Sequence, residues 1–335
     1  MRQYERETWL RPRQEDGISG KAAMIKTGLY RVEDLQPQNV QGFFGGRRRA
    51  SVTLYDKIGE IDNAEWWAEH ILDLFSDAGG AWKRTHSKRF EEFDALVLQH
   101  ISEVFEGRSG LCVHDAAVSD GRTALDFFGK LARVFPNIVY YASDIENTLF
   151  VVEKNGIRVT LNRSGSVLEV VSPPFVFNLV RPENFFLYPI NLICRMWVKR
   201  FQLRDVLDRY RSGNLKAMPL RLVCPHARRL ADTDNRFRLI EQDLLKKTTF
   251  DRAVDIVRAM NVLNATYFNA QDLTLVIRNV FSSLIDGGLF IVGSNDDRDT
   301  TVRGGIYRKV GSQFIRLVHS PISHDAHNAI LAFRG

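Results

Sequence analysis

The stretch Asp115-Ala116-Ala117-Val118-Ser119-Asp120-Gly121 points to the fold of this chain. It follows a short apolar run, residues 111–114, and precedes an amphipathic run, residues 123–134; a second apolar run covers 138–142. A strand, a helix and a second strand in this order are typical of a βαβ unit. Small residues in the first turn of such a unit let the backbone approach a ligand closely. We therefore expect a doubly wound α/β sheet with a ligand-binding turn at residues 115–121.

This turn keeps only part of the glycine pattern of dinucleotide-binding loops. Gly121 stands at the third glycine position, whereas Ala117 and Ser119 replace the other two. A glycine-rich loop of this kind is weak evidence even when it is complete. An ordinary tight turn between a strand and a helix therefore explains the same residues about equally well.

An acidic residue follows the second strand. Asp144 lies 29 residues after Asp115, close to the length of one βαβ unit. In a doubly wound fold an acidic residue at this place accepts hydrogen bonds from the two hydroxyls of a ribose. The alternative is that Asp144 caps the N-terminus of a helix. The turn and Asp144 together indicate a nucleotide site better than either does alone.

The rest of the chain predicts three parts. Residues 1–55 form a partly ordered arm, and residues 56–108 form a helical appendage because apolar residues recur at spacings of three and four in 63–75 and 87–105. Residues 109–335 form the α/β domain, with further strands at 237–240, 253–257 and 289–292 and a helix at 271–285. An insertion at about 150–235 interrupts it, and its strand-like segments 157–161 and 167–171 predict a β-hairpin with a helical tail.

Composition excludes several classes of protein. No stretch supplies the roughly 20 uninterrupted apolar residues of a transmembrane helix, and the N-terminus lacks the apolar core of a secretory signal, so we expect a cytoplasmic protein. Three cysteines without a CxxC pair predict neither a disulfide framework nor a metal site. The formal charge of +6 is diffuse, and nucleic acid is an unlikely partner unless a basic groove lies beside Asp144.

Four segments resemble successive motifs of one enzyme family. They are AAVSDG at 116–121, ASDIE at 142–146, DLLKKTTFDRAVDIVRAMNVLNATYF at 243–268 and LIDGGLFIVGSN at 284–295. In order and spacing they look like the motifs of the chemotaxis-receptor (CheR-type) methyltransferases, which belong to the class I S-adenosylmethionine (SAM)-dependent methyltransferases. The resemblance covers residues 86–310 and implies a Rossmann-like sheet, SAM as cofactor and methyl transfer as activity. That family likewise has alanines and a serine where most relatives have glycines.

The resemblance also implies which residues hold the cofactor. The turn would line the methionine and ribose parts of SAM, Asp144 would hold the ribose hydroxyls, and the pair after strand 237–240 would face the adenine. A further pair would match the Asn-Val of the family's Arg-Asn-Val segment. The implied cofactor-binding residues are Asp115, Ala117, Ser119, Gly121, Asp144, Ile145, Asp243, Leu244, Asn261 and Val262.

The candidate catalytic or acceptor-binding residues are Arg258, Tyr267 and His114. Arg258 is offset from the family's arginine, and Tyr267 matches the aromatic residue that follows. A histidine on a strand, such as His114, is more often a core residue than a catalyst. Arg122 and Thr123 replace the acidic residues that follow the family's first motif, so the methionine amino group would need another carboxylate, such as Asp126, one helical turn further on.

The methyl acceptor stays open between a small molecule and a protein side chain. A receptor substrate does not carry over, because the insertion at 150–235 lacks the family's receptor-binding signature. The rival hypothesis is a non-catalytic interaction module that keeps the fold and still binds SAM or a related nucleotide. The oligomeric state is not predicted.

Two further features have competing interpretations. Residues 185–201 combine aromatic and basic residues as interfacial helices do, which predicts peripheral membrane contact or a cover over the active site. The alternative is a helix that packs its apolar side on a sheet. His319, His324, Asp325 and His327 have a spacing that imitates metal ligands, but a turn before a last strand at 329–333 is the simpler interpretation.

Overall fold

The computed structural model describes residues 25–35, 48–60, 64–73, 75, 88–181, 187–247, 250–295 and 301–335. Much of the arm predicted at 1–55, including 42–46, lies outside these residues, as do the starts of both helices predicted at 63 and 87. The chain divides into two compact units. Unit 1 combines Met1–Trp82 with Leu149–Leu220, and unit 2 combines Lys83–Thr148 with Arg221–Gly335.

Unit 2 is built on a seven-stranded sheet. Its strand order is β10-β4-β3-β11-β12-β13-β14. The first five strands of that order are mutually parallel, and β13 and β14 follow as an antiparallel meander. Renumbered within the unit, the order begins 3-2-1-4-5, which is the order of a doubly wound Rossmann-like sheet. The predicted α/β fold is confirmed. The strands are β3 (Cys112–Ala116), β4 (Val139–Asp144), β10 (Phe237–Glu241), β11 (Val254–Met260), β12 (Leu284–Ser294), β13 (Arg303–Val310) and β14 (Gln313–His319).

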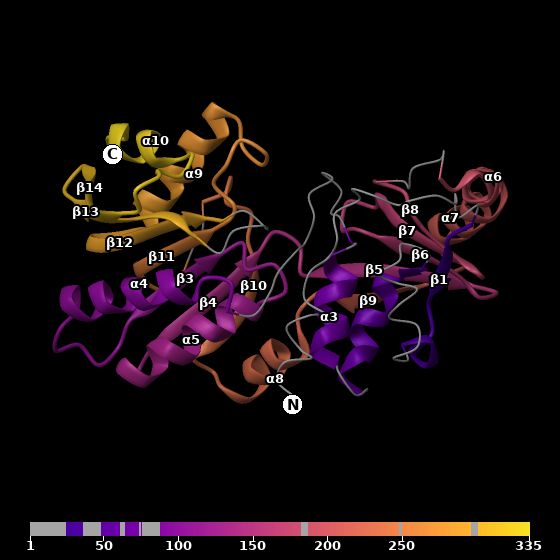
Figure 1. Ribbon diagram of the computed structural model, residues 1–335, viewed down its shortest axis with the longest axis horizontal. Helices are drawn as coiled ribbons and strands as arrows, with labels where there is room; N and C mark the ends of the chain where they lie inside the picture. Colours follow the sequence, from indigo (N-terminus) through magenta and orange to yellow (C-terminus); the bar gives the residue numbers. More distant parts are fainter. Residues whose placement is uncertain are drawn as a thin grey trace. The chain divides into compact units, whose positions relative to one another are not determined.

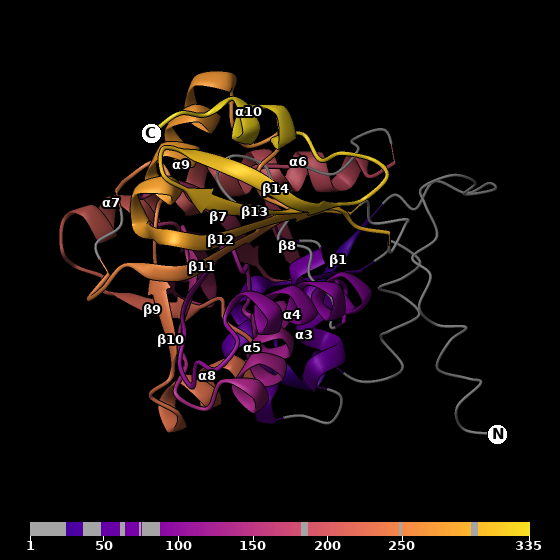
Figure 2. The same ribbon diagram turned by 90° about the vertical axis from the view of Figure 1, so that its left-hand side faces the viewer.

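Helices cover both faces of this sheet, as Figures 1 and 2 show. Side chains of successive strand residues alternate between the faces: Val113 packs in one core cluster and Cys112 in the other. All residues of β3 and β11 are buried, as expected for parallel strands between helical layers. One face carries α4 (Glu91–Val104), α5 (Arg122–Val134) and α8 (Pro225–Thr233), and the other carries α9 (Ala270–Ser283) and α10 (His327–Ala332).

Unit 1 contains a five-stranded sheet of order β8-β7-β6-β5-β9 and a two-stranded parallel sheet. Neighbouring strands from β5 to β8 are antiparallel. Its strands are β1 (Thr27–Leu29), β2 (Arg48–Ala50), β5 (Thr148–Lys154), β6 (Ile157–Leu161), β7 (Val167–Ser172), β8 (Phe175–Asn178) and β9 (Ala217–Arg221). Its helical elements are η1 (Val32–Asp34), η2 (Val52–Glu60), α3 (Ala64–Asp73), α6 (Pro189–Trp197), the π-helix η3 (Val198–Leu203) and α7 (Arg204–Arg211).

Two local predictions need correction. The hairpin predicted at 157–161 and 167–171 exists as β6 and β7, but it is the centre of a larger sheet because β5, β8 and β9 pair around it. The last strand predicted at 329–333 is wrong: these residues belong mainly to α10. A short apolar run has no periodicity that separates a strand from a buried helical turn, and here Ile330 packs against the α9 side of the sheet as part of a helix.

Candidate functional site

The turn after β3 holds backbone conformations that glycine normally supplies. Ala117 has φ of 59°, Ser119 has φ of 58° and Gly121 has φ of 84°. Left-handed backbone is uncommon for residues with a Cβ and costs of order 1–3 kcal/mol at each non-glycine residue. The turn therefore keeps the shape of a glycine-rich loop although only one of its three key positions is glycine.

Gly121 has a second reason to be glycine. It is the N-cap of α5, and a Cβ built there would lie 3.1 Å from the Cβ of Ala227 on α8. The left-handed backbone and the close helix together exclude larger residues without a shift. Because Gly121 ends the turn and caps α5, the N-terminus of α5 adjoins the turn directly. The backbone N–H groups and the dipole of α5 favour negative charge there.

Asp144 lies beside this turn at the end of β4. Its Oδ2 accepts a hydrogen bond from the backbone N–H of Ser119 at 2.8 Å, and the side chain is buried. No helix begins after Asp144; the next element is the strand β5 at Thr148, so the helix-cap alternative does not apply. The hydroxyl Oγ of Ser119 is buried and finds no hydrogen-bond partner among the described residues.

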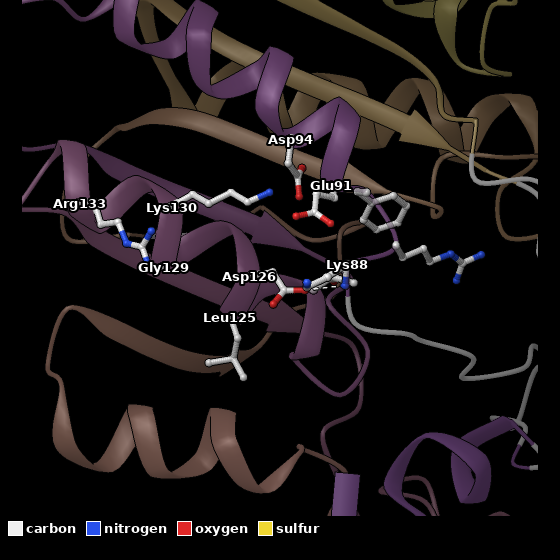
Figure 3. Close-up of a pocket in the computed structure, with 11 residues that line it drawn as sticks. Lys88, Glu91, Asp94, Leu125, Asp126, Gly129, Lys130 and Arg133 are labelled. Carbon is white, nitrogen blue, oxygen red and sulfur yellow. Dashed lines mark hydrogen bonds between the residues drawn. The ribbon is translucent and has the colours of Figure 1, made fainter. Parts of the chain in front are cut away.

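A pocket of about 40 Å³ lies between the carboxyl ends of β3 and β11. These two strands are where the strand order reverses, and ligands of open α/β sheets bind at that point. A larger pocket of about 300 Å³ lies between α4 and α5 and shares Arg89, Phe90 and Thr123 with it, so the two adjoin. Figure 3 shows Glu91 and Asp94 extending from α4 into the larger pocket. The smaller pocket is lined by Arg89, Phe90, Asp115, Ala116, Ala117, Val118, Ser119, Thr123, Arg258, Met260 and Asn261.

Arg258 is held by two buried carboxylates at the floor of the smaller pocket. Its Nη1 lies 3.0 Å from both oxygens of Asp115, and its Nη2 lies 3.0 and 3.3 Å from those of Asp94. The hydroxyl of Tyr140 donates to Asp115 at 2.6 Å, and the ring of Phe127 lies 4.7 Å from the guanidinium. Burial opposes the charge of Arg258, but the two carboxylates outweigh it and raise its pKa. Arg258 therefore stays protonated and cannot act as a base.

The other two candidate catalytic residues do not join Arg258. The Nε2 of His114 lies 2.7 Å from the Oγ of Ser143, and its ring packs against Phe250, on the face of β3 opposite Asp115. Burial lowers its pKa to about 4. Tyr267 lies in the turn after β11 and is 43% exposed. Neither residue lines the two pockets, and their proposed roles stay predictions.

The remaining candidate cofactor residues divide into two groups. Asn261 lines the pocket with φ of 58° and ties β11 to β12, since its Nδ2 donates to Asn295 and its Oδ1 accepts from the Asn295 N–H. Val262 is buried next to it. The other three, like Val262, Asp144 and Gly121, are not among the residues that line either pocket. Ile145 is exposed, Leu244 packs at the edge of the α9-side core, and Asp243 accepts from the N–H of Leu245.

The substituted positions after the turn have specific partners. Arg122 forms a buried ion pair with Asp120, with Nε 3.2 Å from Oδ2, so it completes the turn and does not line the pockets. Thr123 lines both pockets, and Asp126 lines the larger one, where it accepts from the N–H of Lys88. Asp126 thus lies at the larger pocket, and its compensating role toward a methionine amino group stays a prediction.

The sequence did not identify the contribution of α4. Phe90 and Asp94 line the pockets and contact Arg258, from 168 and 164 residues away in the chain. One signal was available: Asp94 lies on the apolar stripe of its helix, four residues after Phe90 and three before Val97. A carboxylate on a buried stripe requires a partner of opposite charge, although the pattern does not say which one.

Comparisons with known proteins give only distant likenesses. No family model and no curated protein matches the chain. Solved structures that match include an O-methyltransferase family protein from Burkholderia thailandensis (17% identity, TM-score 0.28, 62% of this chain and 40% of that one). They also include TrmN from Thermus thermophilus (15%, 0.28, 69% and 51%) and an S-adenosylmethionine-dependent methyltransferase from Clostridium acetobutylicum (13%, 0.29, 72% and 77%). The chain thus spans about half the length of the first two.

The described residues hold neither a cluster of metal-ligating side chains nor a membrane-spanning helix. In that part of the chain no three or more histidine, cysteine, aspartate or glutamate side chains gather as metal ligands would. None of its helices combines the length and apolar character needed to cross a membrane. His324 and His327, near the C-terminus, contact a tyrosine: the Tyr307 hydroxyl lies 2.7 Å from His324 Nε2 and 2.6 Å from His327 Nδ1.

Proposed function

We propose that unit 2 binds S-adenosylmethionine at the carboxyl ends of β3, β4 and β11 and transfers its methyl group to an acceptor. The observation that carries this proposal is the pairing of the turn with Asp144. Three left-handed residues shape the turn, and the N–H of Ser119 holds the Asp144 carboxylate beside it. Carboxylate oxygens are the acceptors that two neighbouring ribose hydroxyls require.

The other parts of the site fit such a ligand. The N-terminus of α5 suits a carboxylate such as that of methionine. The buried Oγ of Ser119 lacks a hydrogen bond that a ligand hydroxyl or amine would supply.

Methyl transfer from a sulfonium needs positioning and exclusion of water, because the leaving group departs without a proton. Asp144 and the turn would fix the nucleoside, and Phe90 and Met260 would present apolar surface at the strand ends. The larger pocket between α4 and α5 would admit the acceptor. We also propose kinship with the CheR-type enzymes, which rests on the four sequence motifs, and an acceptor that is a small molecule or a protein side chain.

Calorimetric titration with SAM and with S-adenosylhomocysteine tests the cofactor. We expect micromolar binding by the wild-type protein. Asp144→Asn should weaken it about tenfold to a hundredfold, because hydrogen bonds to a charged group are lost while Asn still accepts from Ser119. Asp251→Asn removes an exposed carboxylate of the same unit and should bind normally. Absence of binding by the wild-type protein, or full binding by Asp144→Asn, contradicts the proposal.

A second candidate function is a non-catalytic module that binds the nucleotide. It is favoured by the ion pairs of Arg258 with Asp94 and Asp115, which hold the guanidinium of one candidate catalytic residue. Incubation with tritium-labelled SAM and fractionated cell extract separates the two functions. Label transfer that disappears in Asp144→Asn supports the enzyme, and intact binding without any transfer supports the module.

A further inference from the structure

The segment from α6 to α7 in unit 1 has two apolar sides. One side packs on the five-stranded sheet: Val198, Leu203 and Val206 are buried in the same core cluster as strands β5 to β8. Figure 1 shows α6 and α7 beside that sheet. Residues 185 and 186 lie outside the described residues. For 187–201 the packing interpretation describes this side correctly, but it accounts for only part of the apolar residues.

The second apolar side is exposed. Ile193 is 63% exposed, Met196 56%, Trp197 53% and Phe201 55%. Spacings of three and four residues place them on one side of the helix. The rings of Trp197 and Phe201 lie 6.0 Å apart, with the π-helix η3 beginning between them. Four large apolar side chains grouped in this way form a patch of the kind that marks a membrane or protein contact.

Basic residues are interleaved with this exposed patch. Lys199 and Arg200 are exposed between Trp197 and Phe201, and the Arg200 guanidinium lies over the Phe201 ring at 5.5 Å. Arg204 follows on the next turn and is exposed. Across residues 189–211 there are six basic and two acidic residues, a formal excess of four positive charges. A partner must therefore combine an apolar layer, into which the four side chains can insert, with a negatively charged surface.

We propose that this patch, made of Ile193, Met196, Trp197 and Phe201 with Lys199, Arg200 and Arg204, binds the surface of an anionic phospholipid bilayer. Trp and Phe favour the boundary between headgroups and acyl chains, and Lys and Arg favour anionic headgroups. The helix would lie along the bilayer surface, with its packed side still held by the sheet of unit 1. This inference does not depend on the SAM site.

Sedimentation with lipid vesicles tests the proposal. We expect the full-length protein to bind vesicles that contain phosphatidylglycerol and to bind pure phosphatidylcholine weakly, with the difference shrinking at high salt. Lys199→Gln/Arg200→Gln should weaken binding about 25-fold, since each basic residue near an anionic surface contributes about fivefold. Trp197→Ala/Phe201→Ala should weaken it by a similar factor or more. All four side chains are exposed, so thermal unfolding should be unchanged.

Matched controls come from the β13–β14 region of unit 2. Arg303→Gln/Arg316→Gln removes the same charge, and Ile315→Ala/Leu317→Ala removes exposed apolar side chains; both variants should bind vesicles normally. Equal binding by patch and control variants, or no binding to anionic vesicles, overturns the proposal. Self-association in sedimentation velocity that Trp197→Ala/Phe201→Ala abolishes, without vesicle binding, would assign the patch to a second copy of the chain and also overturn it.

Discussion

At the scale of single residues, the Arg258 guanidinium joins α4 to β3. It is fully buried between Asp94 of α4 and Asp115 of β3, so its removal leaves two carboxylates without a counter-charge. We expect Arg258→Met to lower the free energy of unfolding by about 3–5 kcal/mol, measured by urea denaturation. Arg238→Met removes an arginine from an exposed ion pair with Asp251 and should cost under about 1 kcal/mol. If Arg258→Met lowered the stability as little as Arg238→Met, the ion pairs of Arg258 with Asp94 and Asp115 would not be formed.

The buried His114 predicts an acid-sensitive stability. Burial lowers its pKa to about 4 in the folded chain, against about 6.5 when unfolded. Between these values only the unfolded chain takes up the proton, so the contribution of His114 is complete above pH 6.5 and decreases as the pH falls to 4. The loss approaches about 3 kcal/mol. We expect the free energy of unfolding, measured by urea denaturation at each pH, to fall less between pH 6.5 and 4 in His114→Gln than in the wild type. An equal fall in both proteins would contradict the lowered pKa of His114.

At the scale of elements, Glu169 fastens the N-terminal segment of unit 1 to β7. Its carboxylate accepts from the Ser51 hydroxyl at 2.6 Å and from the Val52 N–H at 3.1 Å, at the start of η2. Glu169→Ala leaves the buried Val52 N–H without this acceptor, whereas the Ser51 hydroxyl still has Oγ1 of Thr53 at 2.7 Å. We expect a loss of about 1–3 kcal/mol and faster hydrogen exchange in 48–60, measured by mass spectrometry. Glu153→Ala, at an exposed ion pair, should change neither the stability nor the exchange rate. If residues 48–60 exchange as slowly in Glu169→Ala as in the wild type, Glu169 does not hold this segment on β7.

At the scale of the whole molecule, the two units predict separate responses to a ligand. The proposed SAM site belongs wholly to unit 2, and each unit has its own hydrophobic core. A ligand stabilises the structure that binds it. Saturating SAM should therefore slow hydrogen exchange in β3, β4 and β11 and leave β6 and β7 unchanged. Equal protection of both units would show that they unfold as one cooperative structure.

The parts of the fold predicted from sequence are those that local patterns determine. The βαβ unit, the strands at 237–240 and 253–257 and the helix near 271–285 each carry a periodicity or an apolar run that depends only on neighbouring residues. The same holds for the turn and Asp144, because a strand followed by small residues, and the next strand followed by an acid, place both at one edge of a parallel sheet. In the structure the two lie side by side, since Asp144 accepts from the Ser119 N–H; their binding of a nucleotide stays a prediction.

Only the tertiary structure decided which distant residues meet. Asp94 and Arg258 pair across 164 residues of chain, and β9 joins β5 after the intervening helices of unit 1. It also showed that residues 193–201 keep one apolar side exposed while another packs on the sheet. Local propensity determines which elements form, whereas burial and charge pairing between elements determine their partners. That second choice depends on the whole chain, and no single stretch of sequence records it.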